Sequence, residues 1–332
     1  MTSFDASALA ARIGPCASVD QPLGALTTYK VGGRAAVLAA PTTVEELLRV
    51  ASVAREAGVP VVVIGRGSNM LVCDDGFEGV AVTLTSLAVS DSERADGITI
   101  GMADPTGRVE VVAGGAVALP VLARRTASAG VTGFEWAVGV PGSVGGAVRM
   151  NAGGHGSDME ASLVEAEVVD LLRGERKWLP ASRLGLRFRG SALADHQVVV
   201  AVRLALSAGD PAEAEERLAE IVRWRRENQP GGQNAGSVFV NPVPGELAAA
   251  QVIDSLGLRG LRVGGASVSE KHANFIQAEP GARAADVYAV MCRVREAVER
   301  ETGRRLRSEV RLVGFPPLAA DDHDELHTGV DW

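Results

Sequence analysis

The chain has 332 residues, of which 46% are hydrophobic, and this predicts two or three compact units with ordinary cores. A net charge of −8 argues against a nucleic-acid partner, because binding phosphate backbones needs a clustered basic surplus. Three widely spaced cysteines, no secretory signal and no apolar run of membrane-spanning length predict a cytoplasmic protein without a disulfide framework or membrane segment.

The first two thirds of the chain alternate between predicted strands and helices. Thr43 and Glu46 have the spacing of a capping box, which opens a helix that runs to Gly58. With the strands on either side of it, this helix forms one βαβ unit. Strands are expected at residues 35–40 and 59–64, and near 109–113, 163–171 and 197–206, with a further helix near 121–129.

A second α/β block begins at Asp210 and Pro211, a helix N-cap followed by proline at the first helical position. Helices are expected at about 211–227, 246–256 and 284–302, followed by a strand at 306–313. We therefore divide the chain into an N-terminal segment (1–20), two subdomains of the first α/β block (21–90 and 91–208), a domain formed by the second block (209–315) and an acidic tail (316–332).

Two glycine-rich loops follow predicted strands. The first, Gly65 to Asn69, resembles the start of a Rossmann fingerprint, but Met70 replaces the third glycine and the residues after it predict strand and turn rather than helix. A tight turn between strands is an equally good interpretation of this loop alone. The second, from Val140 to Gly153, has successive unhindered N–H groups that could cradle a pyrophosphate. Together the two loops favour a nucleotide site.

These loops belong to a series of motifs that resembles the UDP-N-acetylenolpyruvoylglucosamine reductases. The series covers about residues 21–314 in order, and its motifs are TTYKVGG, GRGSNMLV, VPGSVGGAVRMNAGG, FRGS, NAGSVFVNP, IDSLGLRG, EKHANF and SEVR. The resemblance implies an α/β multi-domain protein, with an FAD-binding fold of the vanillyl-alcohol-oxidase (PCMH) type and a C-terminal α/β substrate domain. It also implies noncovalent FAD, NADPH as co-substrate and a small-molecule UDP-sugar substrate. The oligomeric state stays open, with a monomer slightly favoured.

The same resemblance implies the site residues. Arg189 matches the arginine that holds the substrate carboxylate, Ser237 the serine that protonates the substrate carbon, and Glu309 the glutamate that completes the catalytic set. The expected cofactor contacts are Tyr29, Gly65, Arg66, Gly67, Ser68, Asn69, Met70, Pro141, Gly142, Ser143, Gly145, Gly146, Asn151 and Gly153. The expected substrate contacts, besides Arg189, are Arg225, Asn241, Lys271 and His272. No metal ligand is expected.

Several of these residues also have simpler interpretations. Glu309 lies between Arg307 and Arg311 on one face of its predicted strand, a pattern that is most often a solvated surface. The basic residues around Arg225 suit a helix C-terminus as well as a substrate diphosphate, and His272 fits a structural role better than a ligand contact. In the tail, His323 and His327 have metal-ligand spacing without any helix signal, so we expect an acidic disordered tail.

The chain departs from the family pattern at Phe188, where many members have tyrosine, and at Val240, where many have lysine. The short span from Ser191 to Pro230 resembles the compact branch that lacks a substrate-capping insertion. Two rival functions remain. One is another flavin oxidase or dehydrogenase of the same fold, acting on a sugar or alcohol, in which His155 could tether the flavin. The other is a nucleotide-sugar binding protein without activity.

Overall fold

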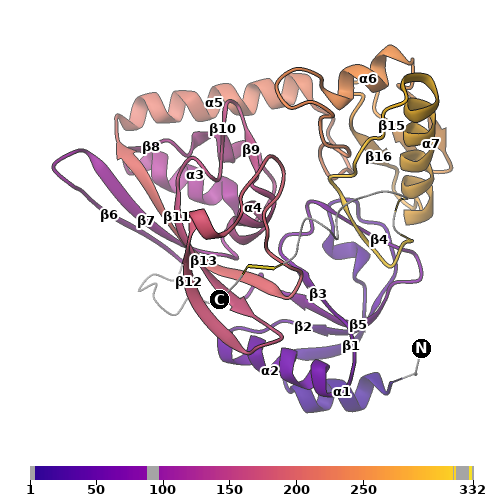
Figure 1. Cartoon of the computed structure of the whole chain (residues 1–332), viewed down its shortest axis with the longest axis horizontal. Helices are drawn as coiled ribbons and strands as arrows, with labels where there is room; N and C mark the ends of the chain where they lie inside the picture. Colours follow the sequence, from indigo (N-terminus) through magenta and orange to yellow (C-terminus); the bar gives the residue numbers. More distant parts are fainter. Residues whose placement is uncertain (1–3, 88–96, 317, 319–328, 331–332) are drawn as a thin grey trace.

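The computed structural model describes residues 4–87, 97–316, 318 and 329–330. Its first unit is a four-stranded sheet with the strand order β1-β2-β5-β3. Helices α1 and α2 lie next to each other along this sheet (Figure 1). Strands β2 and β3, which α2 connects, run parallel to each other as a βαβ unit requires. They are not direct neighbours, because β5 lies between them and runs parallel to both. The elements are α1 (Ala6–Ile13), β1 (Ala17–Gln21), β2 (Ala35–Ala39), α2 (Val44–Glu56), β3 (Val61–Ile64) and β5 (Phe77–Thr83).

The sequence predicts only one of the two helices of this unit. Helix α2 begins where the capping box predicts, with the Thr43 hydroxyl accepting from the Glu46 N–H at 3.2 Å. Helix α1 lies in the N-terminal segment, for which the sequence pattern predicts no element. Asp5 caps it, and Leu9 and Ile13 are buried in the same core as α2. A helix of eight residues depends on such tertiary packing for its stability.

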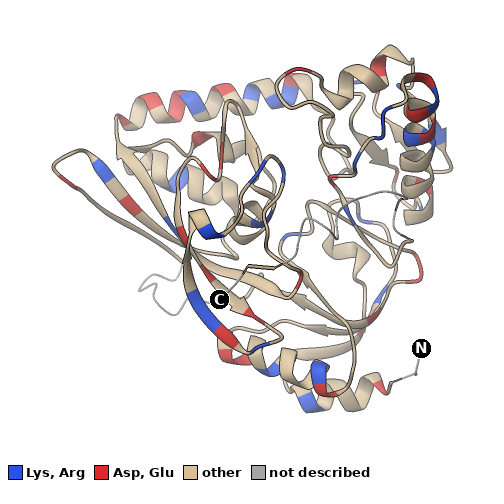
Figure 2. Cartoon of the chain, viewed as in Figure 1, with Lys and Arg blue, Asp and Glu red and all other residues tan. Residues whose placement is uncertain are grey.

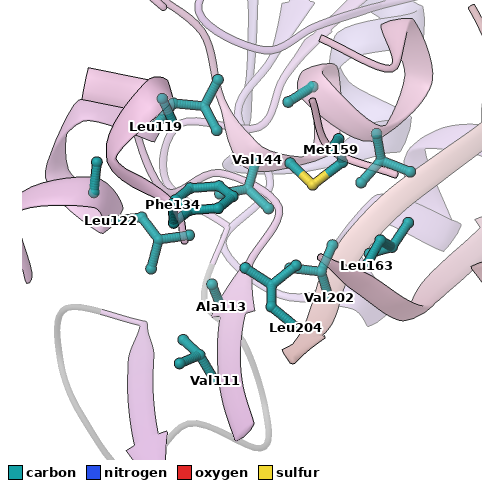
Figure 3. Packing of buried hydrophobic residues seen from close by; sticks show 14 of the residues in the cluster. Val111, Ala113, Leu119, Leu122, Phe134, Val144, Met159, Leu163, Val202 and Leu204 are labelled. Atoms are coloured by element: carbon teal, nitrogen blue, oxygen red, sulfur yellow. The ribbon is translucent and has the colours of Figure 1, made fainter. Parts of the chain in front are cut away.

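The second unit is a larger sheet ordered β12-β11-β13-β7-β6, with β8 also paired to β13. Its core is shown in Figure 3, where Val111, Val202 and Leu204 of the sheet meet Leu119, Phe134 and Val144 of the covering segments. The elements are β6 (Ile98–Ala103), β7 (Arg108–Gly114), α3 (Leu119–Ser128), β8 (Val131–Thr132), α4 (Val144–Met150), β9 (Gly153–Gly154), β10 (Ser157–Asp158), β11 (Leu163–Asp170), β12 (Glu175–Pro180) and β13 (Gln197–Ala208).

Helix α5 (Pro211–Asn228) packs on this second unit, although the sequence division assigns it to the substrate domain. Its buried residues Ala214, Leu218 and Ile221 belong to the core of the larger sheet. Figure 1 shows the helix crossing from this sheet toward the C-terminal unit. Proline and N-cap signals locate where a helix begins, but they do not determine which core its apolar face joins, so the third unit starts after α5.

The third unit contains α6 (Ala249–Ser255), α7 (Ala284–Thr302) and a small sheet ordered β14-β15-β16. The strands of that sheet are β14 (Arg262–Val263), β15 (Ala266–Val268) and β16 (Ile276–Ala278). Helix α7 agrees with the prediction, whereas α6 begins three residues later than expected. The predicted strand at 306–313 is regular only as β17 (Arg311–Val313), which runs parallel to β4 (Met70–Val72), the strand that follows the first glycine loop.

Two described parts of the predicted acidic tail are anchored. Leu318 is buried in the C-terminal core, and Val330 is buried in the core of the larger sheet. Gln197 accepts from the Val330 N–H at 2.8 Å and donates to the Val330 carbonyl at 2.9 Å. At these points the tail is therefore packed rather than disordered. His323 and His327 lie outside the described residues. Of the helices described, none is long and apolar enough to cross a membrane.

Candidate active site

A cavity of about 520 Å³ lies where the three units meet. The first unit contributes the loop after β3, the second contributes α4, β9 and the start of β13, and the third contributes the segments around Ser237 and Glu309. Its volume falls within the range of small-molecule sites.

The two predicted glycine loops meet at this cavity. A Cβ atom on Gly65 would lie 2.6 Å from the Ser143 Oγ, and one on Gly145 would lie 2.7 Å from the Val199 carbonyl oxygen. Glycine at these positions therefore permits a close approach of the two loops and of α4 to the larger sheet. Exposed backbone from both loops remains in the cavity wall, an arrangement that fits the phosphates and ribose of a dinucleotide.

Most of the expected cofactor contacts line this cavity. They are Gly65, Arg66, Gly67, Ser68, Asn69, Met70, Pro141, Gly142, Ser143, Gly145, Gly146 and Gly153. Tyr29 and Asn151 do not. Tyr29 is fully buried in the C-terminal core, and Asn151 supports the wall from behind, with its side chain accepting from the Glu160 N–H at 3.0 Å and donating to the Arg187 carbonyl at 3.2 Å.

Arg189 reaches the cavity from a tight turn. Arg187 and Gly190 exchange two backbone hydrogen bonds, which leaves Phe188 and Arg189 at the tip. Arg189 has φ 57°, a left-handed conformation that is uncommon outside glycine and that often marks functional positions. Its guanidinium donates to the Gly153 carbonyl at 3.0 Å, and its Nε lies 3.6 Å from the Glu309 Oε1.

Ser237 and Glu309 come together through two neighbouring antiparallel segments, which we call the serine segment (residues 235–240) and the glutamate segment (residues 306–311). The Glu309 N–H donates to the Val238 carbonyl at 2.8 Å, and the Val240 N–H donates to the Arg307 carbonyl at 2.9 Å. Both Ser237 and Glu309 line the cavity. The three expected catalytic side chains, from positions 48 and 72 residues apart in sequence, thus border one space.

Glu309 is held in an unusual electrostatic environment. Its side chain is 18% exposed, and burial raises its carboxyl pKa from the usual 4.5 to about 7, although Arg189 and Arg307 act in the opposite direction. The expectation of a solvated surface face is therefore not met. A carboxyl group that titrates near neutral pH inside a cavity is a common feature of active sites.

The expected substrate contacts divide into two groups. Arg225 lines the cavity beside Trp224, and burial lowers its pKa. Asn241, Lys271 and His272 do not line it. The Asn241 side chain accepts from the first N–H of α6, Lys271 donates to the carbonyl of Arg226 at the end of α5, and His272 packs edge-on against Phe275 with ring centroids 4.6 Å apart.

The rim of the cavity carries aromatic and basic side chains. Trp224 is 47% exposed and meets the His155 ring edge-on at 5.0 Å. Figure 2 shows acidic and basic residues distributed along α5, with basic residues toward the end that contributes Trp224 and Arg225. Phe188 is 39% exposed and lies under the Arg189 guanidinium at 4.8 Å, whereas Val240 is buried and does not line the cavity.

Sequence reasoning missed a charged cluster in the cavity wall. Asp195 bridges Arg149 of α4 and Arg311 of β17, with each guanidinium 2.5 Å from one carboxylate oxygen. Desolvation lowers the Arg149 pKa to about 10, and the nearby positive charge of Arg311 makes a smaller contribution in the same direction. The three residues are far apart in sequence, so no local pattern could have joined them. In the part of the chain that is described, no group of three or more histidine, cysteine, aspartate or glutamate side chains could hold a metal ion.

Comparison with known proteins agrees with this geometry. Residues 35–179 match the family model of an FAD binding domain, and residues 228–313 match that of the UDP-N-acetylenolpyruvoylglucosamine reductase C-terminal domain. The second match begins at the end of α5, consistent with the packing of that helix on the larger sheet.

Relatives of the same name match nearly the whole chain. The UDP-N-acetylenolpyruvoylglucosamine reductase of Rubrobacter xylanophilus is 40% identical over 92% of this chain and 98% of its own, and that of Gloeobacter violaceus is 43% identical over 88% and 94%. The crystal structure of the Thermus caldophilus enzyme superimposes with a TM-score of 0.72 at 34% identity, covering 90% of this chain and 98% of its own. The predicted fold class is thereby confirmed, and the chain belongs to the UDP-N-acetylenolpyruvoylglucosamine reductase family.

Proposed function

We propose that the protein uses NADPH and noncovalently bound FAD to reduce the enolpyruvyl ether of a UDP-N-acetylglucosamine to UDP-N-acetylmuramate, a step of peptidoglycan synthesis. The observation that carries the proposal is the meeting of Arg189, Ser237 and Glu309 at a cavity that two glycine loops also line. Such a cavity can hold a flavin and an anionic substrate side by side. A binding protein without activity would not need a proton donor beside a carboxylate clamp.

The two glycine loops would hold FAD, which would supply hydride transfer from NADPH to the terminal vinyl carbon of the enolpyruvyl ether. The adjacent carbon and its carboxylate would then gain negative charge. Arg189 is suited to this charge, because a guanidinium can hold a carboxylate through two parallel hydrogen bonds that strengthen as charge develops. Its left-handed backbone and its bond to the Gly153 carbonyl hold it in the cavity before substrate arrives.

Ser237 completes the reduction by donating its hydroxyl proton to the carbon beside the carboxylate, and solvent then replaces that proton. A serine is a weak acid, so it serves only where strongly basic carbon forms next to it. Glu309 has a pKa of about 7, so much of it is protonated at neutral pH. In that form it can lie beside the substrate carboxylate without repulsion. The Arg225 guanidinium at the rim is available for the substrate diphosphate.

We further propose a cytoplasmic protein; its oligomeric state stays open, with a monomer slightly favoured. The three cysteines are unpaired, which suits a reducing compartment. Within one chain, Arg189, Ser237 and Glu309 already line the same cavity.

The decisive experiment separates the two halves of the reaction by rapid mixing. Ser237→Ala should leave bleaching of the flavin by NADPH nearly intact, because that half needs no proton on carbon. Reoxidation by the UDP-sugar should slow by about 10²- to 10⁴-fold, the loss typical of a missing general acid. Arg189→Ala should in addition weaken substrate binding, because it removes the carboxylate clamp.

Ser128→Ala is a suitable control, since Ser128 is exposed at the end of α3 and does not line the cavity. It should leave both half-reactions unchanged. Normal reoxidation of the Ser237→Ala protein would mean that the proton comes from elsewhere. A protein that cannot be reconstituted with FAD would refute the proposed function as a whole.

A further inference from the structure

Asn274 is a buried polar residue between β15 and β16, with 3% of its surface exposed. Its side chain accepts from the Phe239 N–H at 2.9 Å and donates to the Phe239 carbonyl at 2.8 Å. Its own carbonyl accepts from the Val238 N–H at 2.9 Å. Asn274 therefore makes three hydrogen bonds to the serine segment, immediately after Ser237.

These bonds fix one side of the serine segment, and the glutamate segment fixes the other. Val238 uses its N–H toward Asn274 and its carbonyl toward the Glu309 N–H. The side-chain amide of Asn274 thus pairs with the N–H and the carbonyl of Phe239, as a neighbouring strand would. The serine segment is held between Asn274 and the residue that carries the Glu309 carboxylate.

Asn274 is itself held in place. Its N–H donates to the His272 Nδ1 at 3.3 Å, and the His272 ring packs against Phe275. Burial lowers the His272 pKa, which favours the neutral imidazole that this acceptor role requires. His272 and Asn274 do not line the cavity, but Phe275 and Ser237 do. The EKHANF motif therefore contributes to the cavity directly through Phe275 and indirectly through the serine segment that Asn274 supports.

We propose that Asn274 is a positioning residue for the proton-donating hydroxyl of Ser237, an inference that rests on the proposed function. Removing its side chain leaves the buried N–H and carbonyl of Phe239 unpaired, and the serine segment must shift to satisfy them. A misplacement of about 1 Å can cost roughly 10²-fold in rate. The cavity wall outside the serine segment should stay in place, because Asn274 does not line the cavity and its side chain bonds to Phe239 of that segment.

The test uses the FAD-loaded enzyme and the same two half-reactions. Asn274→Ala should leave flavin bleaching by NADPH within about twofold of wild type and slow reoxidation by the UDP-sugar by about 10- to 100-fold. The solvent deuterium isotope effect on reoxidation should increase, because proton transfer from a misplaced hydroxyl becomes limiting. Asn274→Asp, which keeps the acceptor and loses the donor, should show the same selective defect if the alanine variant folds poorly.

A double-mutant cycle links Asn274 to Ser237. In a Ser237→Ala background, adding Asn274→Ala should slow reoxidation by no more than about twofold, because the hydroxyl that Asn274 positions is already gone. Asp286→Ala is the matched control: Asp286 binds the N–H groups of Gly265 and Arg283 in the same unit, away from the cavity. It should lower stability without a selective loss of reoxidation.

The two proposals fail in different ways. If the protein cannot be reconstituted with FAD, the proposed function is wrong. If Ser237→Ala alone reoxidises at the normal rate, Ser237 is not the proton donor and the positioning role of Asn274 falls with it. If Ser237→Ala is slow but the Asn274 variants are normal, or if the two defects multiply in the double variant, the positioning role alone is overturned. Equal losses in both half-reactions would also overturn it, because they would indicate a general loss of structure.

Discussion

Replacing Glu309 with glutamine should change how the stability of the protein depends on pH. The substitution is nearly isosteric and removes only the ionisable group. Because the folded-state pKa of Glu309 is about 7 and the usual value is 4.5, the folded protein keeps a proton that the unfolded chain has released between these two values. The contribution of this group to the free energy of unfolding is therefore largest below pH 4.5, and it is lost as the pH rises through 7.

The size of the effect follows from the same two values. The difference between a pKa of 4.5 and one of about 7 corresponds to about 3 kcal/mol in the free energy of unfolding. The Glu309 side chain is only 18% exposed, so solvent screening reduces this free-energy difference only partly. Relative to wild type, the Glu309→Gln protein should gain up to about 3 kcal/mol of stability as the pH rises from 4.5 to 8.

Urea unfolding of both proteins at several pH values measures this difference. The flavin concentration must be fixed, because a ligand that binds only the folded state adds its own stabilisation. Glu216→Gln on the exposed face of α5 controls for the loss of one surface charge. If the stability difference between the Glu309→Gln protein and wild type stays constant from pH 4.5 to 8, burial does not raise the Glu309 pKa and the reasoning is refuted.

Three further predictions concern the cofactor and metals. Denaturation should release FAD into solution from wild type and from His155→Ala alike, as chromatography of the filtrate would reveal; flavin that stays attached to the chain would favour a tethered oxidase. Gly65→Ala should weaken flavin retention, since its Cβ would lie 2.6 Å from the Ser143 Oγ, and adding Ser143→Ala should restore part of it in a titration. Chelators should leave turnover unchanged, and recovery by zinc after a loss would contradict this.

The sequence by itself determined the elements whose signals are local. The Thr43 capping box and the Asp210–Pro211 start each act within one turn, and the apolar stripe of the 284–302 helix lies within that one helix, so α2, α5 and α7 begin where those signals predict. The glycine loops could also be recognised, because closely spaced glycines have few structural uses. In each case the physical cause lies within a few neighbouring residues.

Only the tertiary structure decided which candidates border the cavity. Tyr29, Asn241, Lys271 and His272 belong to motifs of the family, yet they contribute to cores, helix ends and ring packing outside the cavity wall. Tyr29 is buried in a core formed mostly by residues 235–318, and Lys271 bonds to Arg226, 45 residues away; a linear pattern does not specify such partners. Asn241 and His272 use partners eight and three residues away, but the sequence does not show that these contacts lie outside the cavity. Membership in a family motif therefore does not by itself place a residue in the cavity wall.

The sequence likewise could not predict the raised pKa of Glu309. Between two arginines, a glutamate in a strand resembles a solvated face, and its pKa would then be lowered. In the structure, β17 pairs with β4 and the glutamate segment pairs with the serine segment, so the carboxyl group is enclosed by three units of the fold. Desolvation then outweighs the attraction of Arg189 and Arg307, because the cost of burying a charge depends on everything that surrounds it rather than on its neighbours in the chain.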